Sequence, residues 1–107
     1  MHFEYKTFQA TITASGTTIL LSPLGNKRYI VERLFISVNK KIHLLSILVV
    51  QDSVNSKVFL KLKGDSGLNR PFILKNLLIA RNGNLAISTT INNDEIFTVY
   101  GHARIQG

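Results

Sequence analysis

Residues 28–50 read RYIVERLFISVNKKIHLLSILVV, and this apolar stretch decides the fold class. Its first arm, residues 29–38, is dominated by β-branched and aromatic side chains, which favour an extended strand. Its second arm, residues 44–50, is equally apolar, and the polar residues 39–41 between the arms predict a turn too short for a helix. We therefore expect a buried antiparallel hairpin that the rest of the chain must cover.

The segments on either side repeat this pattern of short strands separated by turns. Residues 57–63 alternate most clearly, with Val58, Leu60 and Leu62 expected to point inward. Further strands are expected at residues 2–13, 18–21, 72–79, 85–90 and 96–105, with Gly, Pro, Asn and Asp between them. The sequence therefore predicts an all-β fold, a single antiparallel β-sandwich domain of about eight strands over residues 1–107, jelly-roll-like in arrangement.

Composition points to a protein that associates with others. The hydrophobic share of 45% and the mean hydropathy of +0.15 are high for so small a chain. Such excess apolar surface favours a homo-oligomer, and a tightly packed monomer is the alternative. The net charge of +7 favours a polyanionic partner: nucleic acid, an acidic protein surface or anionic lipid.

Several classes of site find no support in the sequence. The chain has no cysteine, and its histidines, His2, His43 and His102, stand apart from other metal-ligating residues. Asp94 and Glu95 are adjacent and so point to opposite sides, unlike an acid–base pair. We expect no catalytic residue, no cofactor, no metal and no enzymatic activity. The N-terminus also lacks a signal-peptide layout, and no apolar run is long enough to span a membrane, so no membrane partner is expected.

Four segments together resemble a known class of viral proteins. They are Gly16-Thr17-Thr18-Ile19-Leu20-Leu21, then residues 25–31, residues 83–88 and residues 98–105. Their order is similar to that in small all-β virion proteins of tailed bacteriophages, which decorate capsids or form head fibres and related appendages. The resemblance implies a β-sandwich or jelly roll that assembles, often as a trimer, on a capsid or tail surface. It also implies a virion location after synthesis in the host cytoplasm, with other virion proteins such as the major capsid protein as partners.

Our first hypothesis is therefore a non-enzymatic structural protein of a phage virion. It would serve as a capsid decoration or auxiliary protein, or as a head-to-tail accessory, and assemble as an oligomer on an acidic protein surface. Its lysines and arginines would steer docking and partner choice. Aromatic side chains of the first and third strands, where a change of phase near residues 6–7 suggests a bulge or an arm, are the candidate subunit contacts: Phe3, Tyr5, Phe8, Tyr29 and Phe35.

The alternative is a basic module that binds single-stranded nucleic acid. Four side chains of residues 57–63 are expected to point outward together and are the candidate polyanion or partner contact: Lys57, Phe59, Lys61 and Lys63. The lysines would neutralise phosphates while the ring stacks on a base. Lysines of this kind also keep an edge strand from pairing with other chains, which is the simpler explanation.

Overall fold

The computed structural model describes residues 4–64 and 71–107, and its regular structure is built from strands. Each predicted strand is found, including the one at residues 72–79 that Asn76 seemed to interrupt. The strands are β1 (Glu4–Ile12), β2 (Gly16–Leu21), β3 (Arg28–Val38), β4 (Ile47–Asp52), β5 (Lys57–Lys63), β6 (Phe72–Ile79), β7 (Leu85–Thr90) and β8 (Phe97–Gln106).

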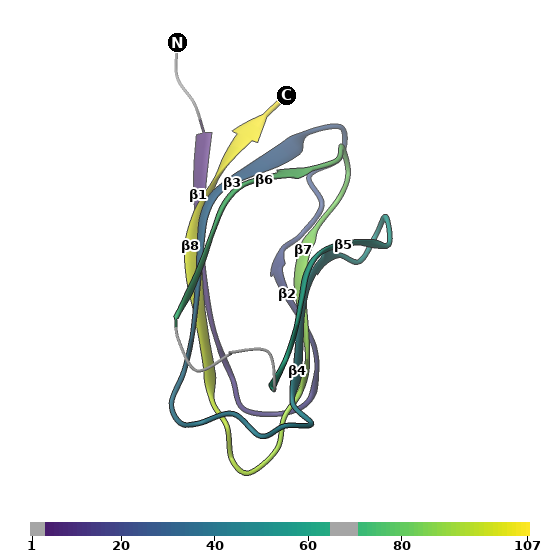
Figure 1. The fold of residues 1–107 in the computed structure, drawn as a ribbon. Helices are drawn as coiled ribbons and strands as arrows, with labels where there is room; N and C mark the ends of the chain where they lie inside the picture. Colours follow the sequence, from purple (N-terminus) through teal and green to yellow (C-terminus); the bar gives the residue numbers. More distant parts are fainter. Residues whose placement is uncertain (1–3, 65–70) are drawn as a thin grey trace.

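The strands form two antiparallel sheets that face each other as a sandwich (Figure 1). One sheet has the order β1-β8-β3-β6 and the other the order β2-β7-β4-β5. Successive strands β1 to β8 thus wind between the sheets in the order of a jelly roll, which confirms the predicted fold class. Glu4 pairs with Ile105, so β1 begins where β8 ends, at one end of the sandwich.

The predicted hairpin of residues 28–50 is wrong. Strand β3 lies between β8 and β6, whereas β4 lies between β7 and β5 in the opposite sheet. Residues 39–46 cross the end of the sandwich to join them, and they are not a short turn. Both arms are apolar because each is an interior strand of its own sheet. Apolar content therefore reports that a strand is buried, without identifying its partner.

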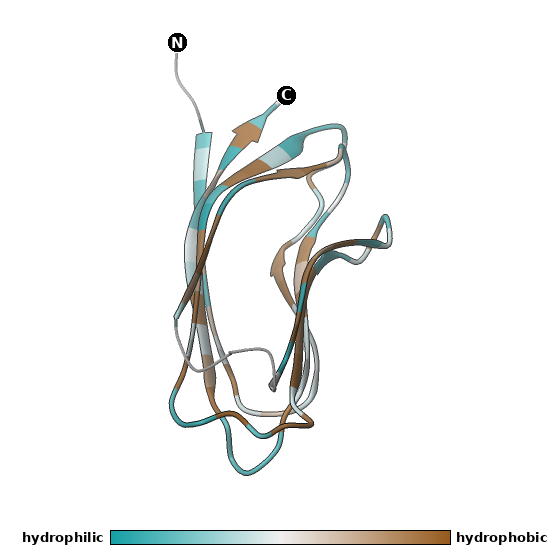
Figure 2. Cartoon of the chain, viewed as in Figure 1, coloured by the Kyte–Doolittle hydropathy of each residue, from teal (hydrophilic) through white to brown (hydrophobic). Residues whose placement is uncertain are grey.

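The core lies between the two sheets and is filled by inward-facing side chains from both. Figure 2 shows hydrophobic residues along the strands and hydrophilic residues in much of the loops. Tyr29 and Phe97 are the largest fully buried side chains. The Tyr29 hydroxyl donates a hydrogen bond to the Ser22 carbonyl oxygen at 2.5 Å, so its polar end is satisfied within the core.

A bulge in β3 sets which of its side chains enter the core. The register between β3 and β8 shifts between Val31 and Arg33. Tyr29 and Val31 face inward before the shift, and Leu34 and Ile36 face inward after it. Uninterrupted alternation would place Tyr29 and Leu34 on opposite faces, so the bulge lets one long strand contribute to the core along its whole length.

Candidate assembly surface

The outer face of the β1-β8-β3-β6 sheet presents two rows of apolar side chains. The register aligns Tyr5 with Arg104, Ile30 and Leu78 across the four strands. Farther along, it aligns Gln9 with Tyr100, Phe35 and Ile73. We call the apolar members of these rows the apolar outer face: Tyr5, Ile30, Phe35, Ile73, Leu78 and Tyr100.

An aromatic stack fixes the second row of this face. The Phe35 and Tyr100 rings stack with their centroids 4.8 Å apart and their planes 12° from parallel. A cross-strand aromatic pair of this kind is worth about 0.5–1.5 kcal/mol beyond its buried area. Tyr100 also borders a shallow hollow with Thr7 and Gln9 of β1. The stacked pair thus lies in the outer surface of the sheet, with Tyr100 the more exposed of the two rings.

Charged side chains separate the two apolar rows. Arg33 on β3 pairs in register with Lys75 on β6. His102 Nε2 lies 3.4 Å from Glu32 Oε1, and this contact is an ion pair when the histidine is protonated. The outer face therefore combines exposed apolar area with a central band of charged side chains.

The predicted subunit contacts divide between this surface and the core. Tyr5, which is 57% exposed, and Phe35 lie on the apolar outer face. Phe8 and Tyr29 are buried in the core of the chain itself, so their predicted place in a subunit contact is wrong. The register of β1 against β8 is continuous, which excludes the expected bulge and sends Tyr5 outward and Phe8 inward. Phe3 lies outside the described residues.

The predicted polyanion contacts lie on β5, which is an edge strand of the sheet β2-β7-β4-β5. The free side of β5 has no partner strand within the described residues. Lys57, Lys61 and Lys63 are exposed, as expected. Phe59 is not an exposed ring: it packs against the core, while Val58 is exposed. The register between β4 and β5 shifts at Val58–Leu60, and this bulge reverses the predicted alternation. The Lys57 ammonium lies 5.3 Å from the Phe59 ring centroid.

The sequence did not indicate that two carboxylates would be buried at the ends of the sandwich. The first is Asp52, fully buried, which accepts hydrogen bonds from the backbone N–H groups of Val54, Asn55 and Asn84 and from the Asn55 side chain. Burial raises the pKa of the Asp52 carboxyl, but these hydrogen bonds outweigh it and leave the pKa below its ordinary value. Asp52 thereby joins the β4–β5 loop to the loop before β7.

The second is Glu95, at the other end of the sandwich. Glu95 Oε2 accepts a hydrogen bond from the His43 N–H at 2.7 Å. Glu95 Oε1 accepts bonds from the Ser46 hydroxyl at 2.5 Å and the Asn92 N–H at 2.8 Å. Burial raises the pKa of the Glu95 carboxyl, yet the hydrogen bonds, led by that from Ser46, leave it below its ordinary value. Glu95 ties the turn before β8 to residues 43–46.

Neither carboxylate is arranged for chemistry. All the groups that meet Asp52 and Glu95 are donors from loops, which suits a structural role. Within residues 4–64 and 71–107, no three His, Cys, Asp or Glu side chains gather closely enough to hold a metal ion. His43 lies in the loop of residues 39–46 and His102 on β8, and His2 is outside the described residues. In the same part of the chain no helix could cross a membrane.

Comparison with solved structures places this fold among phage capsid chains. A chain in the acidic stable capsid structure of Helicobacter pylori bacteriophage KHP30 matches with a TM-score of 0.73 and 14% identity, covering 97% of this chain and 90% of that one. A chain in the capsid asymmetric unit of cyanophage Pam1 matches with a TM-score of 0.56 and 13% identity, covering 97% of this chain and 84% of that one. No protein-family model and no curated protein matches the sequence. The chain therefore shares its β-sandwich fold with chains of phage capsids, in agreement with the resemblance seen in its sequence.

Proposed function

We propose that this chain is a non-enzymatic structural component of a phage virion that assembles as a homo-oligomer on an acidic protein surface of the capsid. One observation carries the proposal: the fold match covers 97% of this chain and 90% of a capsid chain. The matched chain is thus a small protein of similar length, and its fold accounts for nearly all of the present chain. A decoration, auxiliary or head-to-tail accessory role suits a domain of this size.

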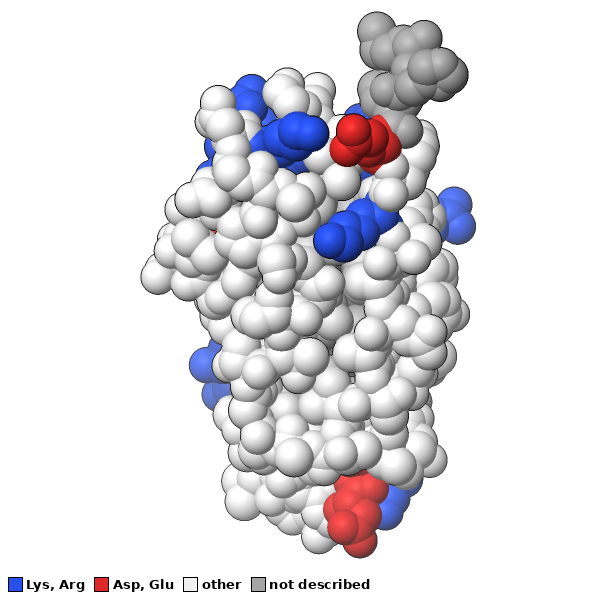
Figure 3. Space-filling view, turned by 180° about the vertical axis from the view of Figure 1, so that it is seen from behind, with Lys and Arg blue, Asp and Glu red and all other residues white. Residues whose placement is uncertain are grey.

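Contacts between copies are proposed for the apolar outer face and the edge beside it. Strands β1 and β2 contact each other and form one edge of the sandwich, and residues 7–24 contain no charged side chain. In Figure 3, lysine and arginine gather mainly near one end of the molecule, and the middle of that side is largely uncharged. At this uncharged edge, copies of net charge +7 can meet without like charges facing each other. Tyr5 and Phe35 are the predicted contacts that this surface retains.

Docking on an acidic surface is proposed for the opposite, basic edge. Lys57, Lys61 and Lys63 on β5 and Lys75 on β6 lie along neighbouring edges of the two sheets. Such charges raise the rate of encounter with an acidic partner and select it among others. A nucleic acid would also be attracted, but the Phe59 ring is partly buried against the core and the Lys57 ammonium lies 5.3 Å from its centroid, which makes it a poor platform for a base.

The oligomer is tested by light scattering and native mass spectrometry of the purified chain. We expect a discrete oligomer, a trimer by the resemblance, at micromolar concentration. Replacing Ile73 and Leu78 by Ser should dissociate it into monomers that keep the β-sheet circular dichroism of the wild type, since both side chains are exposed in the single chain. The control replaces Val54 and Val58, which are exposed elsewhere, by Ser. A wild-type monomer would contradict the assembly.

Docking is tested by sedimentation with empty capsid shells prepared without this protein. We expect the wild type to bind the shells and binding to weaken as salt is raised, because salt screens the lysines. A variant with Lys57, Lys61 and Lys63 replaced by Gln should bind more slowly and depend less on salt. Binding to a single-stranded oligonucleotide, with none to shells, would favour the nucleic-acid alternative instead.

A further inference from the structure

Two adjacent leucines project from the end of the sandwich that lies away from the start of β1. Leu44 is 70% exposed and Leu45 is 69% exposed, more than any other large hydrophobic side chain within residues 4–64 and 71–107. They lie in residues 39–46, which cross between β3 and β4 at the lower end in Figure 1. We call these two side chains the leucine tip.

The leucine tip is held outward by buried anchors on both sides. Ile42 is buried in the core before it, and the fully buried Ser46 follows it. The Ser46 hydroxyl and the His43 N–H both donate to Glu95, and the Ser46 N–H donates to the His43 carbonyl oxygen at 3.0 Å. With both flanks fixed, the residues between them must turn away from the core. The leucines are exposed by the fold itself.

The same bonds keep the leucine tip in one conformation. The Leu45 N–H donates to His43 Nδ1 at 3.0 Å, and the Gly64 N–H donates to the Ser46 carbonyl oxygen at 2.8 Å. A side chain added at Gly64 would overlap the His43 carbonyl, so β5 packs directly against this loop. A loop ordered before binding loses little conformational freedom when a partner covers it. Such a loop is suited to insertion into a pocket.

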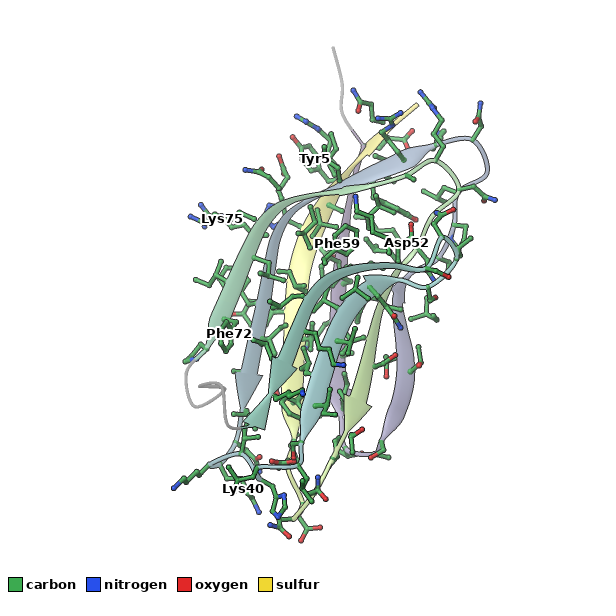
Figure 4. The ribbon with its side chains drawn as sticks, turned by 45° about the vertical axis from the view of Figure 1, so that its right-hand side comes forward. Tyr5, Lys40, Asp52, Phe59, Phe72 and Lys75 are labelled. Atoms are coloured by element: carbon green, nitrogen blue, oxygen red, sulfur yellow. The ribbon has the colours of Figure 1, made fainter. Side chains whose placement is uncertain are left out.

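The charged residues around the leucine tip indicate what charge a partner's pocket should carry. Among the described residues at this end, Lys40, Lys41 and Lys63 outnumber the exposed carboxylate of Asp94. Lys40 donates to the Asn93 carbonyl oxygen at 2.8 Å, and Figure 4 shows it at the end of the molecule opposite Tyr5. A partner that buries the leucines must accept these ammonium groups at its rim. An acidic rim does so, and a second copy with the same lysines does not.

We propose that the leucine tip docks into an apolar pocket with an acidic rim on the capsid shell protein. The inference rests on the proposed function and adds to it the contact that fixes the chain on the shell. The β5 lysines would steer the approach, and Leu44 and Leu45 would supply the buried anchor. A few buried apolar side chains at the centre of an interface commonly carry most of its affinity.

The test is shell binding by a variant with Leu44 and Leu45 both replaced by Ser. Because both are exposed, its melting temperature should match the wild type, while its dissociation constant for empty shells should rise about tenfold or more. The control, with the exposed Val54 of the β4–β5 loop replaced by Ser, should bind as the wild type does. Lys41→Glu, which places a carboxylate against the acidic rim, should also weaken binding.

Each other outcome overturns the inference in a recognisable way. Equal binding by the leucine variant and the wild type would show that the tip makes no contact, and would leave the proposed function standing. Equal losses in the leucine variant and the valine control would indicate nonspecific adhesion. A wild type that fails to bind shells would remove the proposed function and this contact with it. Binding to vesicles of anionic lipid that depends on Leu44 and Leu45, without shell binding, would assign the tip to a membrane.

Discussion

Replacing Glu95 by Gln should strongly destabilise the fold while hardly changing its shape. The carboxylate is fully buried and accepts three hydrogen bonds, from the His43 N–H, the Ser46 hydroxyl and the Asn92 N–H. A glutamine can keep its carbonyl oxygen at the position that serves Ser46 and Asn92. Its amide group then faces the His43 N–H, and two donors oppose each other in a buried site.

The magnitude follows from these three bonds. Leaving the His43 N–H without an acceptor costs about 1–3 kcal/mol, and the two bonds that remain lose the strengthening of a charged acceptor, about 1 kcal/mol each. Relief from burying a charge offsets part of this loss. We expect a net loss of about 2–4 kcal/mol in the free energy of unfolding. A domain of roughly 100 residues changes its melting temperature by about 4 °C per kcal/mol, so the fall should be about 8–16 °C.

The difference between the two proteins should depend on pH. Because the pKa of Glu95 in the fold lies below its ordinary value of 4.5, the unfolded chain binds more protons than the folded chain as the pH falls below about 4.5. The stability that the carboxylate contributes is therefore fully present above that pH and is lost as the pH falls through the lower, folded pKa. Glu95→Gln lacks this contribution, so the difference in unfolding free energy between the wild type and the variant should shrink on acidification. The pKa of Asp52 is also lowered, so the variant keeps some acid sensitivity.

Differential scanning calorimetry from neutral to acidic pH provides the measurement, with Asp94→Asn as the matched control. Asp94 neighbours Glu95, is exposed, and occupies the left-handed conformation that Asn also adopts, with φ of 57°. The Asp94→Asn substitution removes the same unit charge and leaves the hydrogen bonds of Glu95 intact, so the melting temperature of this variant should change little. The reasoning is refuted if Glu95→Gln melts like the control at neutral pH, or if the gap stays constant on acidification.

Three further changes test the packing of the core. Gly101→Ala would place a methyl group 2.8 Å from Phe8 Cζ and against the Arg33 carbonyl oxygen. Urea unfolding should therefore show a loss of about 2 kcal/mol or more in the free energy of unfolding. The control, Gly107→Ala, places its methyl group in open space and should show no loss. Phe59→Ala should lower the free energy of unfolding by roughly 2–3 kcal/mol, because the ring packs on the core. Oligonucleotide binding should stay at the wild-type level. A loss of that binding would show that the ring contacts the nucleic acid. Tyr29→Phe removes the bond to the Ser22 carbonyl and should cost about 1 kcal/mol; since burial raises the Tyr29 pKa, absorbance titration should lose a phenol that ionises above about 10.

Period-two alternation was sufficient to predict the strands and the fold class. It succeeds because a strand in a sandwich has one face in the core, so β8 and β1 show their pattern without reference to any other strand. The alternation does not show which strands pair with each other. Residues 39–46 read as a turn between two apolar arms, although Glu95, 49 residues beyond Ser46, holds them across the end of the sandwich. Local pattern does not contain that long-range contact.

Bulges explain why some side chains were assigned to the wrong face. One inserted residue reverses the alternation for the rest of a strand, so Phe59 turns inward and Val58 outward. In β3 a signal was available: Glu32 and Arg33 are consecutive polar residues in an otherwise apolar strand, and the register shifts there. In β5 no such signal exists, since Val58, Phe59 and Leu60 are all apolar and either phase buries a hydrophobic face.

The buried carboxylates show why the ends of this sandwich differ from its sides. Asp52 and Glu95 each collect N–H groups from two loops that are distant in sequence, so they order loop backbone that would otherwise need water. A buried charge is a costly way to stabilise a small domain, and hydrophobic residues often serve better. What each carboxylate adds here is a set of hydrogen bonds that ties two distant loops together. At the Glu95 end that arrangement presents Leu44 and Leu45 to the outside, and the fixed geometry of the loop is what an assembling surface needs.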